Sequence, residues 1–176
     1  MTTPMVGTGA RGTYGTILLL LSASSVLPGV GMVTAPFVGL ASLLLGIQLT
    51  TGRSTPWLPA WLRSRIEASD LGPRFGHWLH QRCRPLLQMA LPSFPLPLAG
   101  LTVAWSSLIL ILPLAIIPFS NTIPSLSVGL IGAGLLTGRS LFGWLGMALS
   151  GGYTVALVLL AEVLILALQA VLRFFT

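Results

Sequence analysis

Long apolar stretches interrupted by proline and glycine make up most of this chain, and its charged residues gather in the middle. Six of the nine arginines lie between residues 53 and 84. Only 7% of the residues are charged and 54% are hydrophobic, which is too little polar surface to cover a water-soluble globule. The sequence therefore predicts an all-α integral membrane protein, with one membrane domain over residues 1–176.

Two segments of the chain resemble each other. TAPFVGLASLLLGIQLTTGRS at residues 34–54 and TIPSLSVGLIGAGLLTGRS at 122–140 both begin Thr-x-Pro and end in Gly-Arg-Ser. Each follows an apolar run and a turn, which predicts two repeated helix-turn-helix hairpins over residues 14–54 and 102–140. Paired, short, proline-interrupted segments in two halves are typical of transporters with broken or re-entrant helices. The residues leave open whether these hairpins are re-entrant and whether they are inverted.

The two remaining segments have different characters. Residues 141–176 are long and apolar enough for a C-terminal transmembrane helix. Residues 55–84 are basic and amphipathic, which predicts a cytoplasmic or interfacial segment that lies among lipid head groups; a solvated loop is the alternative. Its expected membrane-interface residues are Trp57, Trp61, Arg63, Arg65, Trp78, Arg82 and Arg84.

The two turns and the ends of the hairpins supply the candidate substrate or pore residues. We expect short helices to start near Pro36 and Pro124 and to direct their N-terminal dipoles into the membrane, which suits an anion. The same groups could instead satisfy backbone freed by the prolines. The candidates are Pro28, Gly29, Thr34, Pro36, Gln48, Arg53, Ser120, Asn121, Thr122, Pro124 and Arg139.

Glu162 is the sharpest single candidate, because it stands within an otherwise apolar stretch. An ionisable group at membrane depth marks a functional site by default, and desolvation would favour proton coupling. The alternative is a glutamate that joins helices or subunits, with Arg139 as a possible partner.

The sequence gives little evidence for a metal site, a cofactor, an enzyme or a nucleic-acid partner. His77, His80 and Cys83 recur every third position, but arginines lie between them, so we expect no metal and no cofactor. Known hydrolase and nucleotide-binding motifs are missing and there are only three acidic residues, so we expect no enzyme. The arginines sit beside tryptophans and apolar spans, which favours lipid over nucleic acid as a partner.

The stretch LPGVGMVTAPFVGLASLLLGIQLTTGRSTPWLP, residues 27–59, and IPFSNTIPSLSVGLIGAGLLTGRSLFGW, residues 117–144, resemble the ExoD family of bacterial exopolysaccharide-synthesis membrane proteins. The run from Gln48 through Gly52-Arg53 to Pro56-Trp57-Leu58-Pro59 carries most of the likeness. A difference is the second exit, Gly138-Arg139-Ser140, where that family often has Arg-Asp-Gly. The resemblance implies a multi-pass protein of the bacterial inner membrane that takes part in exopolysaccharide production, and no catalytic mechanism.

These observations lead to two functional hypotheses. The first is a transporter or flippase-like protein for an anionic or lipid-linked solute, based on the broken segments and Glu162. The second is a non-transporting accessory or scaffold protein that contacts the polysaccharide-synthesis machinery. We also expect a homodimer, because the small residues at Gly129, Gly132, Ala133 and Gly134 permit close helix packing.

Overall fold

The computed structural model describes residues 8–26, 30–53, 55–57, 59, 64, 81, 93–111 and 121–175. Within these ranges the chain forms five long helices and no strand. They are α1 (Thr8–Val26), α2 (Val30–Thr50), α5 (Leu96–Ile111), α6 (Thr122–Thr137) and α7 (Ser140–Phe175). The all-α prediction is confirmed for this part of the chain.

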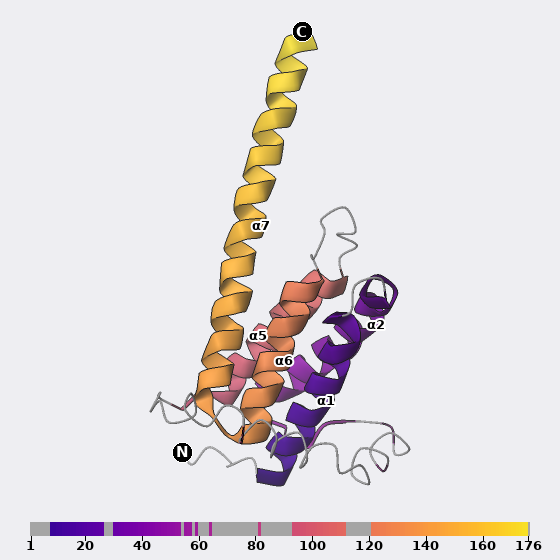
Figure 1. Cartoon of the computed structure of the whole chain (residues 1–176), viewed down its shortest axis with the longest axis vertical. Coiled ribbons are helices and arrows are strands. Elements are labelled where there is room, and N and C mark those ends of the chain that lie inside the picture. Colours follow the sequence, from indigo (N-terminus) through magenta and orange to yellow (C-terminus); the bar gives the residue numbers. More distant parts are fainter. Residues whose placement is uncertain are drawn as a thin grey trace.

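The first four helices form a bundle of two hairpins that open toward the same end (Figure 1). The hydroxyl of Tyr14, near the start of α1, donates to the carbonyl of Arg53 after the end of α2, at 3.5 Å. At the same end, Phe94 before α5 packs edge-on against Trp144 of α7, with ring centroids 5.1 Å apart. The hairpins therefore run in the same sense, and the inverted arrangement left open by the sequence does not fit.

Each hairpin packs mainly against the other one, α1 with α6 and α2 with α5. Both pairs meet at glycines. A Cβ atom on Gly15 would lie 2.6 Å from the carbonyl oxygen of Gly132, and one on Gly46 would lie 2.9 Å from that of Gly100. These backbones approach each other closely, because glycine places no side chain between them.

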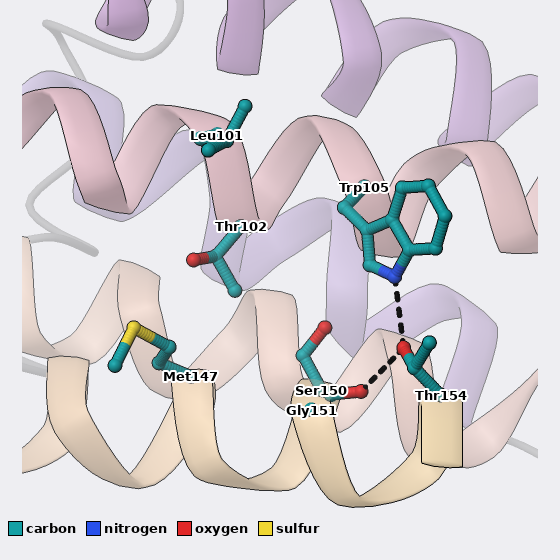
Figure 2. Close-up of a pocket in the computed structure, with 7 residues that line it drawn as sticks. All are labelled: Leu101, Thr102, Trp105, Met147, Ser150, Gly151 and Thr154. Carbon is teal, nitrogen blue, oxygen red and sulfur yellow. Dashed lines mark hydrogen bonds between the residues drawn. The ribbon is translucent and has the colours of Figure 1, made fainter.

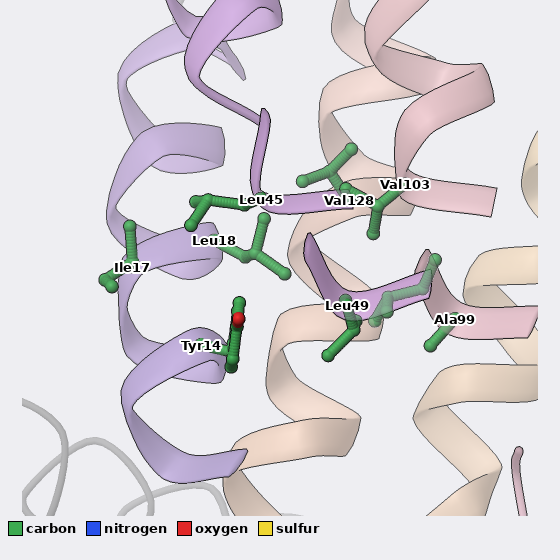
Figure 3. Packing of buried hydrophobic residues seen from close by; sticks show 9 residues of the cluster. Tyr14, Ile17, Leu18, Leu45, Leu49, Ala99, Val103 and Val128 are labelled. Atoms are coloured by element: carbon green, nitrogen blue, oxygen red, sulfur yellow. The ribbon is translucent and has the colours of Figure 1, made fainter. Parts of the chain in front are cut away.

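The apolar core lies where these helix pairs meet (Figure 3). Tyr14 and Leu18 of α1 are fully buried there, as is Val103 of α5. Ile131 of α6 belongs to the same cluster. The small residues expected to form a dimer are used inside the chain instead. A Cβ on Gly129 would meet the Ser22 hydroxyl at 2.7 Å, and one on Gly134 would meet the Gly143 nitrogen at 2.9 Å.

The repeated Gly-Arg sequence ends a helix both times. Gly52 and Gly138 have φ angles of 69° and 66°, in the left-handed region that only glycine adopts at little cost. The N–H of the following arginine then bonds back five residues, from Arg53 to Gln48 O and from Arg139 to Gly134 O, both at 3.1 Å. This is a Schellman C-cap, so the repeated exit is first of all a helix stop.

In the described part of the chain, Pro36 and Pro97 interrupt the helices less than the sequence suggested. The start of a helix near Pro36 is wrong, because α2 begins at Val30 and continues through Pro36. A proline inside a helix removes one backbone hydrogen bond, and α2 forms here at that cost. Helix α5 begins at Leu96, earlier than expected, because Pro97 lies in its first turn, where no intrahelical N–H bond is lost. Pro124 likewise occupies the first turn of α6.

Helix α7 has 36 residues and continues through Gly151 and Gly152. Among the described helices it is the one long and apolar enough to cross a membrane, over Ser140–Arg173. Its first part packs on α6 and α5, and its second part extends well beyond the bundle (Figure 1). From Val155 to Arg173 nearly every residue is exposed, and we call this segment the free half of α7.

Candidate functional site

A groove of about 410 Å³ lies between α5 and the first half of α7 (Figure 2). Its walls are mainly apolar, and three of its residues carry hydroxyl groups. The lining residues are Leu101, Thr102 and Trp105 from α5 and Met147, Ser150, Gly151 and Thr154 from α7.

The groove opens on the outer face of the bundle. Leu101 is 60% exposed and Trp105 is 48% exposed, so the indole forms a wall that a ligand could reach. The indole Nε1–H donates to the Thr154 hydroxyl at 2.8 Å, and that hydroxyl donates to the Ser150 carbonyl at 2.9 Å (Figure 2). These bonds fix the indole ring against α7 and set the width of the groove.

A chain of buried serines continues from the groove into the bundle. The Ser150 and Ser106 hydroxyls are 2.9 Å apart, and the Ser106 and Ser127 hydroxyls are 3.5 Å apart. Ser127 then donates to the carbonyl of Gly146 at 2.7 Å. The chain thus joins α5, α6 and α7 by hydrogen bonds that do not depend on charge.

Three more hydroxyls are buried nearby without a hydrogen-bond partner among the described residues. They belong to Ser25 of α1, Ser42 of α2 and Ser125 of α6. Ser42 and Ser125 are completely buried and Ser25 is 2% exposed. Buried hydroxyls normally find partners, so these three serines stand out among the described residues.

The predicted turn residues are only partly within the described structure. Pro28, Gly29 and Ser120 lie outside it. Thr34 donates to the carbonyl of Ser24 at 3.4 Å, which ties α2 to α1. Asn121 precedes α6 without a side-chain capping bond, and Thr122 is half-buried beside the buried Pro124.

Gln48, Arg53 and Trp57 come together at the open end of the first hairpin. The backbone N–H of Trp57 donates to the Gln48 side-chain oxygen at 2.5 Å. Gln48 therefore holds the chain that leaves α2, and the Trp57 ring is 70% exposed. The other residues predicted at the membrane interface lie outside the described ranges, as do the two histidines and the cysteine: Trp61, Arg63, Arg65, Trp78, Arg82, Arg84, His77, His80 and Cys83.

The structure separates Glu162 from Arg139. Arg139 precedes the first residue of α7, and Glu162 lies in the free half, about 33 Å up the helix axis at about 1.5 Å per residue. The suggested pairing of these two residues within one chain is therefore wrong. Glu162 is exposed and belongs to neither hairpin nor groove.

The groove and its serine chain were missed by sequence reasoning. A signal was present, because Ser106 and Ser107 stand side by side within an apolar helix, and Ser150 and Thr154 are four residues apart on α7. Hydroxyl residues in apolar helices commonly bond to neighbouring helices. No sequence pattern indicates which helix lies opposite, so the groove itself could not be inferred.

The chain matches the family described as exopolysaccharide synthesis, ExoD, over residues 5–159. It is 34% identical over 151 residues to an uncharacterised protein of Synechocystis, which covers 78% of this chain and 67% of that protein.

A second relative is Protein ExoD of Rhizobium meliloti, 28% identical over 150 residues, or 77% of this chain and 58% of that protein. The chain thus spans less than two thirds of the Rhizobium protein. No solved structure matches. Because the family match covers most of the chain, this protein belongs to the ExoD family of exopolysaccharide-synthesis proteins.

Proposed function

We propose that the protein is a multi-pass inner-membrane protein of exopolysaccharide synthesis that binds a lipid-linked intermediate in the α5–α7 groove. Membership of the ExoD family supports the process. The groove is the observation that supports the class of ligand, because it combines apolar walls with a hydrogen-bonding edge.

The groove suits the lipid part of such an intermediate. Leu101, Met147 and the Trp105 ring offer an apolar surface to an isoprenoid chain. The exposed apolar residues around it, including Leu108 of α5, would face lipid in a bilayer, so a membrane-dissolved ligand could enter from the side. The hydroxyl of Thr154 marks where a polar group of the ligand would find a partner.

The packing of the bundle favours binding over passage of a solute between the hairpins. At Gly15 and Gly132, and again at Gly46 and Gly100, the backbones leave no room even for a methyl group. An accessory role, in which the protein holds an intermediate for the polysaccharide-synthesis machinery, therefore has the better support. A flippase-like role is the second candidate, favoured by the serine chain that carries polar groups inward from the groove.

We further propose that the two hairpins are copies of one unit. The glycine contacts support this, because in both of them, Gly15 with Gly132 and Gly100 with Gly46, the first helix of one hairpin meets the second helix of the other. Four helices of 16 to 21 residues are about 24 to 32 Å long at about 1.5 Å per residue. Helix α6, at about 24 Å, falls below the roughly 30 Å of a bilayer core, which is consistent with a re-entrant second hairpin.

Filling the groove tests the proposed function. Gly151 lines the groove and Gly152 does not, and a Cβ atom at either position would meet nothing within 4 Å. Both positions should therefore accept leucine without disturbing the bundle. Gly151→Leu is expected to lower photocross-linking of an isoprenoid phosphate probe in nanodiscs, and to lower exopolysaccharide secretion when it replaces the natural gene.

Gly152→Leu is the matched control and should behave like the natural protein in both measurements. If a folded Gly151→Leu variant takes up the probe as well as the control does, the groove is not the binding site. If the probe is lost and secretion is unchanged, the groove binds lipid but has no part in exopolysaccharide production.

A further inference from the structure

The free half of α7 carries all its polar side chains on one face. Its sequence from residue 155 to 173 is apolar except for Glu162, Gln169 and Arg173. These residues are seven and four positions apart, and such spacing returns to the same side of a helix. Val155, Val158 and Leu166 lie on the same face, which we call the polar stripe.

The bundle of the same chain does not cover this stripe. The residues of α7 that touch the bundle, including Gly143, Ser150 and Thr154, lie roughly 90° away around the helix axis at about 100° per residue. Val155, Val158 and Leu166 are 60%, 53% and 64% exposed. Among the described residues, neither Glu162 nor Gln169 has a hydrogen-bond partner.

A bilayer alone does not satisfy such a stripe. Glu162 lies near the middle of the free half, and lipid chains offer it no hydrogen bond. Ionisable and amide side chains in membrane helices normally face another helix, where they bond across the interface. A protein partner that packs on this face would satisfy the stripe.

We propose that this partner is the free half of α7 in a second copy of the chain, packed in parallel about a two-fold axis. A two-fold axis brings each residue of the stripe against its own copy. Two carboxamides at Gln169 are self-complementary, because each is both donor and acceptor. A carboxylic acid, like a carboxamide, carries both a donor and an acceptor, so Glu162 can pair with its own copy in the same way. The spacing of seven places both layers on the seam of a parallel helix pair.

This interface is independent of the groove and of the proposed function. The dimer expected from the sequence was based on glycines of α6, which are occupied within the chain. The interface proposed here lies at the other end of α7, and residues 160–175 fall outside the range matched by the ExoD family.

Cysteine cross-linking of the full chain in native membranes tests the proposal. In a Cys83→Ser background, Leu166→Cys lies on the stripe and Leu164→Cys lies on the opposite face, at 64% and 63% exposure. Mild oxidation should give a product of twice the 18.5 kDa chain mass for Leu166→Cys, several-fold more than for Leu164→Cys. Equal yields from the two faces, or a greater yield from Leu164→Cys, would overturn the proposal.

A second measurement separates hydrogen bonding from mere proximity. Glu162→Leu should weaken dimerisation in bilayers about tenfold, as measured by energy transfer between labelled chains, whereas Glu162→Gln should retain it. If Glu162→Leu dimerises as tightly as the natural chain, the stripe does not form the interface. A product on the stripe of a mass other than two chains would mean that a different protein occupies it, and would also overturn the proposal.

Discussion

Gly15 is the residue at which a single methyl group should do most damage to the bundle. A Cβ atom there would lie 2.6 Å from both the Gly132 oxygen and the Leu136 nitrogen, and both are backbone atoms that cannot move aside alone. Overpacking of this kind usually costs about 1–3 kcal/mol. We expect Gly15→Ala to lower the free energy of unfolding in detergent by at least that much.

Gly12 provides the control one turn earlier on the same helix. A Cβ atom at Gly12 would meet nothing within 4 Å. Gly12→Ala should therefore be neutral, or stabilising by up to about 1 kcal/mol through better helix propensity. Equal losses of stability from the two variants would show that the contact between α1 and α6 is looser than the structure has it.

At the scale of the elements, the two adjacent serines of α5 differ in whether they bond to other helices or within their own helix. Both are completely buried. Ser106 bonds to α7 and α6, whereas Ser107 donates to Val103 O of its own helix at 2.6 Å. Ser106→Ala should cost about 1 kcal/mol in the free energy of unfolding, because it removes bonds between helices.

Ser107→Ala should cost less, because the lost bond lies within one helix and alanine is the better helix former. Denaturant titration of both variants in the same detergent measures the difference. A larger loss from Ser107→Ala would mean that the serine chain does not hold α5, α6 and α7 together.

The helices also show which parts of the fold could be predicted from the sequence and which could not. The helix over residues 141–176 was predicted, because its apolar stretch is too long for any other structure. The continuation of α2 through Pro36 was not predicted. The effect of a proline on a helix depends on which neighbouring groups bond to the carbonyl that the proline leaves free. The groove depends on the register of α5 against α7, which is set by packing between residues far apart in the chain.

At the scale of the whole molecule, the two hairpins run in the same direction, and this predicts the membrane topology of the protein. Thr51 and Ser140 follow the two bundle helices that run toward the open end, and Asn121 lies at the other end of α6. Cysteines at Thr51 and Ser140 should react with impermeant reagents from the same side of the membrane, in a Cys83→Ser background. Asn121→Cys should not react from that side.

Reaction of Thr51→Cys and Ser140→Cys from opposite sides would contradict the bundle and restore the inverted arrangement. Labelling in intact cells and in inverted vesicles distinguishes the two results. The natural protein with Cys83→Ser alone supplies the background reactivity.

Because each hairpin packs mainly against the other, the bundle can complete its folding only after the second hairpin has been synthesised. Helices α1 and α2 leave the ribosome first, but the surfaces of Gly15 and Gly46 are completed only by α6 and α5. The first hairpin therefore lacks its closest contacts until residue 137 has been synthesised. In a chain that ends before residue 96, the contact surfaces around Gly15 and Gly46 would stay uncovered, and quality-control proteases could recognise the hairpin.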